Sequence, residues 1–158
     1  MDIEKKLRLY LDTSVFNFAV STQEIAQERE ITLLFFEEIK VGRFVPYVSD
    51  IVFEEIDQAP KKKQEELLAF MKQFVLESVP ITEESRTLAR RYLTEGVIPE
   101  KYENDALHMA IASVHNLDAI VSWNFEHMVK FKTRKQVPAI NTLMGYKGIE
   151  ICSPQEVM

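Results

Sequence analysis

The chain has 158 residues, of which 46% are hydrophobic and 28% are charged, and its formal net charge at pH 7 is -6. This length suits one domain with a sizeable core, and we expect residues 1–158 to form a single domain. The acidic balance excludes a protein that holds nucleic acid by bulk electrostatic attraction alone, although it leaves room for a nucleic-acid enzyme.

Two further classes of protein are excluded by the sequence. A single cysteine, Cys152, rules out an internal disulfide framework and a cysteine-rich zinc site. No apolar run is long enough to span a bilayer, and the N-terminus lacks the apolar core of a signal peptide. We therefore expect a cytoplasmic protein with no membrane partner.

The first half of the chain alternates between short apolar runs and helical patterns. Residues 7–11 predict a strand that ends in the polar turn Asp12-Thr13-Ser14. Residues 22–41 predict a helix, because the following residues recur at helical spacing: Ile31, Leu34, Phe35 and Ile39. Residues 44–48 predict a second strand, which Pro46 weakens. Ser49 is the expected N-cap of a helix over 50–57.

The pattern continues through the middle of the chain. Pro60 is expected to begin a helix, whose predicted apolar set is Leu67, Leu68, Met71, Phe74 and Val75. Residues 79–81 predict a third strand. Thr82 is expected to open a helix that Gly96 closes.

The last part of the chain predicts one more helix and two more strands. Asn104 is the expected N-cap of a helix over 105–116, with one apolar stripe formed by Leu107, Ala110, Ile111 and Val114. Residues 119–122 and 149–152 predict the fourth and fifth strands.

Strands that alternate with helices indicate an α/β fold with a mostly parallel sheet and helices on both faces. In such sheets the site lies beyond the C-terminal ends of the strands, at a topological switch point. Asp12 and Asn124 both follow predicted strands, and Asp105 opens a helix after a loop. We therefore expect these residues to meet at one edge of the sheet.

Asp12, Glu55 and Asp105 lie at the ends or beginnings of predicted elements, where carboxylates gather to bind a divalent cation. Thr13 and Ser14 are placed to hydrogen-bond Asp12 or a water on the metal. Simpler interpretations remain open, because a turn aspartate often caps the next segment and a first-turn acid such as Asp105 stabilises its own helix.

Helical geometry separates the two acids of the Glu54-Glu55 pair. At about 100° per residue, Glu55 falls between Ile51 and Val52 on the apolar arc, whereas Glu54 points away from it. A carboxylate on the apolar face needs a partner, because an unpaired buried charge is costly. Glu55 is therefore the functional candidate.

The segment Ser122–His127 follows the fourth predicted strand and contains Asn124, Glu126 and His127. Asn124 offers a neutral oxygen ligand. No pair of histidines has zinc-site spacing. A basic group follows, and we expect it to contact the backbone of a polyanion if the acids form a metal site: Lys130, Lys132, Arg134 and Lys135.

Four segments in this order resemble the motifs of the PIN-domain family, which includes VapC-type toxin ribonucleases. Leu9–Ser14 is similar to the first motif, Val48–Ile56 to the second with its acid at Glu55, and Asn104–Ala110 to the third. Val121–Asn124 resembles the fourth motif, and Ile149–Val157 resembles the closing strand. The resemblance implies a single-domain, three-layer PIN-like fold.

The same resemblance implies a metal-dependent endoribonuclease. Asp12, Glu55 and Asp105 would hold Mg²⁺ or Mn²⁺, Asn124 would orient a water or contact the metal, and Thr13, Ser14 or Ser49 would support the carboxylates. The implied partners are an RNA substrate, an antitoxin protein in an apolar groove, and a second copy in a homodimer.

The chain departs from the family pattern at Asn124, where an aspartate is usual, with Glu126 as an acid two residues later. This departure leaves an alternative, a PIN-fold module that binds RNA or protein with little or no cleavage.

Two other enzyme classes fit less well. A haloacid-dehalogenase-type phosphatase needs a second acid where Ser14 stands. A phosphorylated receiver domain needs an acidic pair near the first strand, a phosphoacceptor aspartate after a middle strand and a late lysine, a pattern that the segments after residues 48 and 81 do not supply.

Overall fold

The computed structural model describes residues 5–22 and 26–158, and it contains one five-stranded, fully parallel sheet in the order β3-β2-β1-β4-β5. The strands are β1 (Leu7–Leu11), β2 (Phe44–Val48), β3 (Glu77–Ser78), β4 (Ala119–Val121) and β5 (Glu150–Cys152). The helices are α1 (Thr13–Val20), α2 (Ala26–Lys40), α3 (Asp50–Asp57), α4 (Lys61–Met71), α5 (Glu83–Thr94), α6 (Glu103–Val114), α7 (Phe131–Leu143) and α8 (Pro154–Val157). None of these helices is both long and apolar enough to cross a membrane.

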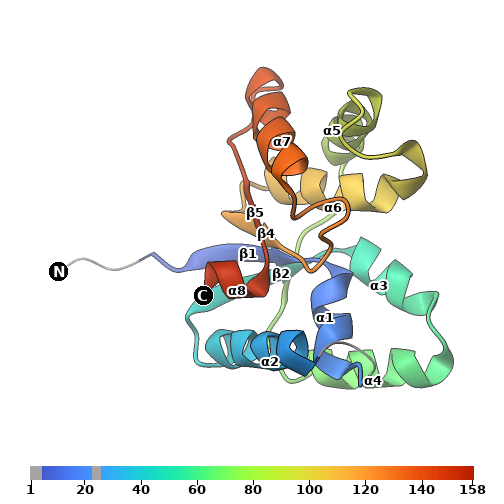
Figure 1. Cartoon of the computed structure of the whole chain (residues 1–158), viewed down its shortest axis with the longest axis vertical. Coiled ribbons are helices and arrows are strands. Elements are labelled where there is room, and N and C mark those ends of the chain that lie inside the picture. Colours follow the sequence, from blue (N-terminus) through green and yellow to red (C-terminus); the bar gives the residue numbers. More distant parts are fainter. Residues whose placement is uncertain (1–4, 23–25) are drawn as a thin grey trace.

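Helices cover both faces of the sheet, which confirms the predicted three-layer α/β fold (Figure 1). α1 to α4 lie on one side of the sheet, and α5, α6 and α7 lie on the other. The alternation of side chains along β1 explains the two cores, because Tyr10 faces the α5–α7 side while Leu9 and Leu11 face the α1–α4 side.

The order of the strands creates a switch point between β1 and β4. From β1 the chain moves outward through β2 to β3, and it then returns to place β4 on the other side of β1, with Leu11 opposite Val121. The C-terminal ends of β1 and β4 are therefore neighbours, and Asp12 and Ser122 follow them directly. This is the edge at which the sequence predicts a site.

Several predicted elements are confirmed, and α3 has the predicted bounds. Thr82 caps α5 in a capping box with Ser85, and Gly96 follows that helix with a φ of 75°. Proline cannot donate a backbone hydrogen bond to a neighbouring strand. Pro46 is nevertheless tolerated in β2, because β3 pairs only with Tyr47 and Val48 and leaves Pro46 without a partner on that side.

Other predictions were wrong. The third strand is Glu77–Ser78 rather than 79–81, because Pro80 has no N–H to donate to a ladder. Asn104 is inside α6 rather than its N-cap, since a short 3-10 helix (Glu100–Tyr102) leads directly into that helix. α6 has no single apolar stripe, because Ala106–Ser113 are buried on all sides.

The prediction missed three helices and misplaced three side chains; the short α8 lies within Ile149–Val157, the segment that resembles a closing strand. α1 occupies the position of the expected turn, and α7 contains Pro138, which obscures its helical pattern. Leu34 of α2 is 60% exposed, Leu68 is 38% exposed, and Val75, beyond the end of α4, is 84% exposed. The predicted helix over 22–41 includes residues 23–25, which lie outside the described residues.

Candidate functional site

Asp12 lies at the end of β1, where its carboxylate caps α1. Oδ1 accepts hydrogen bonds from the backbone N–H of Ser14 at 3.1 Å and from its hydroxyl at 2.5 Å. Oδ2 accepts one from Ser122 Oγ at 2.8 Å, which links the ends of β1 and β4. The residue is buried. Burial raises the pKa of Asp12, although the charge of His108 and the hydrogen bonds from Ser14 and Ser122 oppose that rise.

Glu55 projects from α3 toward the same edge of the sheet. Its Oε1 accepts a hydrogen bond from Thr13 Oγ1 at 2.9 Å and pairs with His108 Nε2 at 2.5 Å. The side chain is 30% exposed, whereas Glu54 is exposed, as its helical position predicts. Burial alone would favour the protonated form, but the hydrogen bond and charge of His108, with the bond from Thr13, hold the pKa of Glu55 below its usual value.

His108 of α6 lies beside Glu55, one of the three candidate acids. Its side chain is buried, which alone would lower its pKa. The hydrogen bond and charge of Glu55, together with the charges of Asp12 and Asp105, nevertheless raise the pKa of His108 above its usual value. Hydrogen bonds link the segments that carry the three acids: Thr13, next to Asp12, bonds Glu55, and Ser122 and Asn124, two residues apart, bond Asp12 and Asp105.

Asp105, in the first turn of α6, is held by the segment after β4. Its Oδ2 accepts hydrogen bonds from Asn124 Nδ2 at 3.1 Å and pairs with His127 Nδ1 at 2.9 Å. The ring of Tyr102 packs against His127 with 4.0 Å between centroids. Glu126 points outward, with 80% of its side chain exposed and its Oε1 3.7 Å from His127 Nε2.

Both ends of the Asn124 amide bond to the protein. Nδ2 donates to Asp105, and Oδ1 accepts the backbone N–H of His127 at 2.9 Å. The backbone N–H of Asn124 donates to Ser122 Oγ at 2.9 Å. Asn124 therefore orients Asp105, and its carbonyl oxygen is directed at the backbone of the turn.

Comparison with known protein families decides the assignment of the fold. The PIN domain family model matches residues 9–126, which include the four segments that carry these side chains. The chain is a PIN domain protein. No curated protein sequence is significantly similar to it.

Solved structures similar to this PIN domain include toxins of VapBC toxin–antitoxin systems. VapBC2 from Rickettsia felis, bound to a promoter DNA fragment, has a TM-score of 0.61 and 16% identity, with 93% of this chain and 98% of that chain covered. VapBC from Salmonella typhimurium, bound to DNA, has a TM-score of 0.60 and 16% identity, with 94% and 98% covered. VapC20 from Mycobacterium tuberculosis, a toxin that cleaves the sarcin-ricin loop, has a TM-score of 0.58 and 13% identity, with 75% and 92% covered. At these identities the likeness establishes the fold.

The donor atoms of the PIN domain site suit a hard divalent cation, because Asp12, Glu55 and Asp105 would present carboxylate oxygens to it. Within residues 5–22 and 26–158, no group of three or more His, Cys, Asp or Glu side chains is arranged so that it could hold a metal ion. Mg²⁺ commonly binds through one or two carboxylates and keeps several of its waters.

The polar residues predicted to support the acids have different partners. Ser14 and Thr13 bond to Asp12 and Glu55, respectively. Ser49 is the N-cap of α3 but makes no capping hydrogen bond with its side chain, which instead pairs with Tyr10 OH at 2.7 Å.

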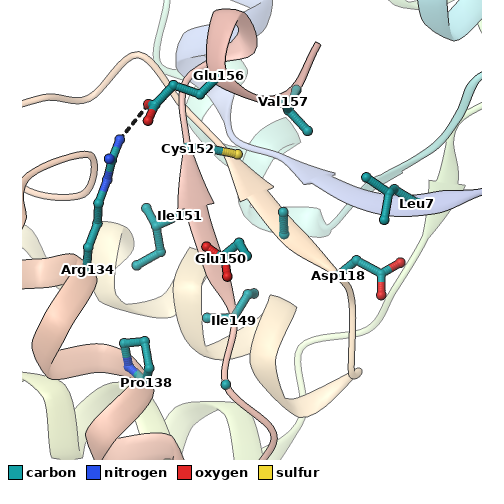
Figure 2. Close-up of a pocket in the computed structure, with 12 residues that line it drawn as sticks. Leu7, Asp118, Arg134, Pro138, Ile149, Glu150, Ile151, Cys152, Glu156 and Val157 are labelled. Carbon is teal, nitrogen blue, oxygen red and sulfur yellow. Dashed lines mark hydrogen bonds and ion pairs between the residues drawn. The ribbon is translucent and has the colours of Figure 1, made fainter.

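The basic group splits around α7. Lys132 and Lys135 are exposed; Lys132 Nζ donates to the Gly96 carbonyl, and Lys135 Nζ lies 5.5 Å from the Phe131 ring centroid. Lys130, at the N-cap of α7, is half-buried. Arg134 instead turns toward β5, where it pairs with Glu156 across a hollow of about 600 Å³ (Figure 2). The lining of that hollow includes none of the three acids.

Sequence reasoning missed His108, His127 and Ser122 as parts of the site. His108 follows Asp105 by three residues, a spacing that places two side chains on the same face of a helix. That spacing was the available signal. Ser122 and His127 have no comparable pattern, because the turn after β4 brings them to the acids.

The Glu55–His108 pair predicts a pH-dependent stability in protein freed of metal by EDTA. Because folding lowers the pKa of Glu55, its ionised form stabilises the folded protein at pH values above its unfolded pKa of about 4.5. This stabilisation is lost as the pH falls through the pKa of Glu55 in the folded protein. Because folding raises the pKa of His108, its charged form stabilises the folded protein at pH values below its unfolded pKa of about 6.5. This stabilisation is lost as the pH rises through the pKa of His108 in the folded protein. Both contributions are present from about pH 4.5 to 6.5.

We expect Glu55→Gln to lower the Tm by about 4–8 °C in that window, as for the loss of about 2 kcal/mol, and by less at pH 9. Thermal unfolding across the pH range measures this difference. Glu54→Gln, a change of the exposed neighbour, is the matched control. A difference that does not vary with pH would contradict the charge pairing.

Proposed function

We propose that this PIN domain protein is a divalent-metal-dependent endoribonuclease that hydrolyses RNA phosphodiester bonds. The observation that carries the proposal is the hydrogen-bond network at the edge of the sheet: Thr13, next to Asp12, bonds Glu55, and Ser122 and Asn124 of one turn bond Asp12 and Asp105. These acids come from the β1–α1 junction, α3 and α6, and they meet at the edge of the sheet where parallel α/β folds bind ligands.

In this proposal Asp12, Glu55 and Asp105 would hold Mg²⁺ or Mn²⁺. When bound, such a cation would lower the pKa of a water and offset negative charge on the attacked phosphate. Ser14 and Ser122 hold the Asp12 carboxylate by its two oxygens, while Asn124 and His127 hold Asp105. These bonds leave each carboxylate little freedom to turn, so the site is largely formed before a substrate arrives.

RNA as the substrate is supported by membership of the PIN family and by the fold shared with VapC20, which cleaves the sarcin-ricin loop. The exposed Lys132 and Lys135 are the candidate contacts to the RNA backbone, with Lys130 beside them. Arg134 is a weaker candidate, because its guanidinium pairs with Glu156 beside β5.

A second candidate function, RNA or protein binding without turnover, is favoured by one observation. The Asn124 carbonyl oxygen is directed at the His127 backbone N–H, so Asn124 adds neither charge nor a free oxygen to the site. Metal-dependent turnover separates the two functions, since a binding module would hold RNA and leave it intact.

Metal removal tests the proposed function directly. We expect the purified protein to cleave a mixed RNA pool with Mn²⁺ or Mg²⁺, to lose cleavage in EDTA, and to regain it when excess metal is restored. Gel analysis of end-labelled RNA measures the products, and calorimetric titration with Mn²⁺ measures binding separately. Metal binding without cleavage would favour the binding module, while cleavage that persists in EDTA would contradict the metal mechanism.

We also propose that the protein is the toxin of a cytoplasmic toxin–antitoxin pair and forms a homodimer. The fold shared with the VapBC toxins supports this proposal. An apolar groove between α2 and α4 is the proposed antitoxin site, and its lining includes Leu33, Leu34, Phe36, Phe70 and Phe74. Glu30 and Glu37 flank the groove, so the antitoxin segment is expected to be apolar with basic flanks.

Leu34→Glu tests the groove without disturbing the core, because Leu34 is largely exposed. If the product of a neighbouring short open reading frame is the antitoxin, we expect this change to weaken its binding about 30-fold, as for a residue at the centre of an interface. Calorimetry on the purified pair measures the dissociation constant, with Val41→Glu as an exposed control outside the groove. Equal binding by wild type and Leu34→Glu would place the antitoxin elsewhere.

A further inference from the structure

A chain of hydrogen bonds runs through the interior and ends at Glu55. Ser49 Oγ lies 2.7 Å from Tyr10 OH, which lies 2.7 Å from His108 Nδ1. His108 Nε2 lies 2.5 Å from Glu55 Oε1. Ser49, Tyr10 and His108 are buried, whereas Glu55 reaches solvent. The chain therefore connects the core to the one partly exposed carboxylate in it.

The chemistry of these groups fixes which ring nitrogen faces Glu55. An ionised carboxylate only accepts hydrogen bonds, so His108 Nε2 is the donor. In neutral His108, Nδ1 then accepts from Tyr10 OH, whose oxygen accepts from Ser49. In charged His108, Nδ1 donates to Tyr10, which donates to Ser49. The Nε2–H group points at Glu55 in both forms, because each hydroxyl can reverse its role.

The chain joins the elements that carry the three acids. Tyr10 belongs to β1, two residues before Asp12, and Ser49 precedes α3, which carries Glu55. His108 belongs to α6, three residues after Asp105. A single buried network thus ties β1, α3 and α6 together next to the acids. Such a network is costly to bury, and an apolar core would fill the space without that cost.

We propose that His108 is a positioning residue for the metal site, with Tyr10 and Ser49 fixing its ring. His108 and Thr13 both bond to Oε1 of Glu55, so in the described part of the chain the hydrogen bonds to this carboxylate fall on one oxygen. Oε2 is therefore the oxygen that would bind a cation. The inference rests on the proposed function, because it assigns to His108 the orientation of a metal ligand.

The Mn²⁺ affinity of the 158-residue chain, measured by calorimetry without RNA, tests this proposal. We expect His108→Gln to weaken Mn²⁺ binding about 10-fold or more, as for other residues that orient metal ligands. Tyr10→Phe keeps the buried ring, removes the hydroxyl, and should weaken binding by a smaller factor. His115→Gln is the matched control, because that imidazole bonds the Pro80 carbonyl away from the site.

A double variant separates positioning from general loss of structure. In a Glu55→Gln background we expect His108→Gln to cause no further loss of Mn²⁺ affinity, because its effect passes through Glu55. The ¹⁵N shifts of the His108 ring should show a protonated Nε2 in the wild type, with Nδ1 changed by Tyr10→Phe.

The proposal would be overturned if folded His108→Gln bound Mn²⁺ with wild-type affinity. If His108→Gln does not fold, wild-type Mn²⁺ affinity in Tyr10→Phe would overturn it instead. Additive losses of Mn²⁺ affinity in the double variant would also overturn it. Absence of Mn²⁺ binding by the wild type would refute the proposed function itself, and with it this role of His108.

Discussion

Asp12→Asn is expected to reduce metal-dependent RNA cleavage by about 10³-fold, the largest effect of any single change in this protein. A ligand that helps a cation to stabilise charge in the transition state is worth several kcal/mol, and each 1.36 kcal/mol corresponds to about tenfold in rate. Single-turnover cleavage of a defined RNA measures the loss. Asp57→Asn, at the exposed end of α3, removes the same charge outside the site.

The fold should survive Asp12→Asn. Asparagine caps helices about as well as aspartate, so Oδ1 can keep the bonds from Ser14. Burial already disfavours the charged form of Asp12, so the neutral side chain should leave the metal-free Tm equal or higher. Cleavage at the wild-type rate by this variant would indicate a contaminating nuclease and remove Asp12 from the site. A large fall in Tm would indicate a mainly structural role.

Asn124→Asp is expected to tighten Mn²⁺ binding about tenfold and to destabilise the metal-free protein. In the variant, Oδ1 of the new carboxylate can still accept the hydrogen bond from the backbone N–H of His127. Its second oxygen, however, would replace the Asn124 Nδ2 group, which now donates to Asp105 Oδ2 at 3.1 Å. Two carboxylates at that separation repel each other, and a cation relieves the repulsion. We expect a fall of about 2–8 °C in the metal-free Tm, as for 1–2 kcal/mol, that added Mn²⁺ reverses.

Calorimetry and thermal unfolding with and without Mn²⁺ measure these two effects. Asn104→Asp is the charge-matched control, since Asn104 is exposed in the first turn of the same helix that carries Asp105. A similar gain of affinity in both variants would mean that Asn124→Asp acts only through general charge. Unchanged Mn²⁺ affinity in Asn124→Asp would show that position 124 does not face the cation.

The sequence predicted the sheet and its acid-bearing edge because both depend on local patterns. β1, β2 and β4 are short apolar runs, and Asp12 follows the first of them directly. Helical periodicity distinguished Glu55 from Glu54 because α3 is a regular helix with both apolar neighbours buried.

What the sequence did not predict depends on contacts between distant segments. Aromatic and β-branched residues in α1 gave no helical signal, and packing of Val15 and Phe16 against the sheet decides its structure. His108 was a lone histidine until the fold placed Tyr10 on one side of its ring and Glu55 on the other. Arg134 appeared to belong to a basic run, but its partner, Glu156, lies in α8.

The placement of β4 beside β1 has a consequence for protein synthesis. β1 is made near the beginning of the chain, yet its partner β4 and the Asn124 turn emerge more than 100 residues later, as the Leu9–Ala119 register shows. The edge of the sheet that carries Asp12 and Asn124 therefore cannot form until the residues through β4 and its following turn have left the ribosome. The proposed activity would be absent from the nascent chain up to that point.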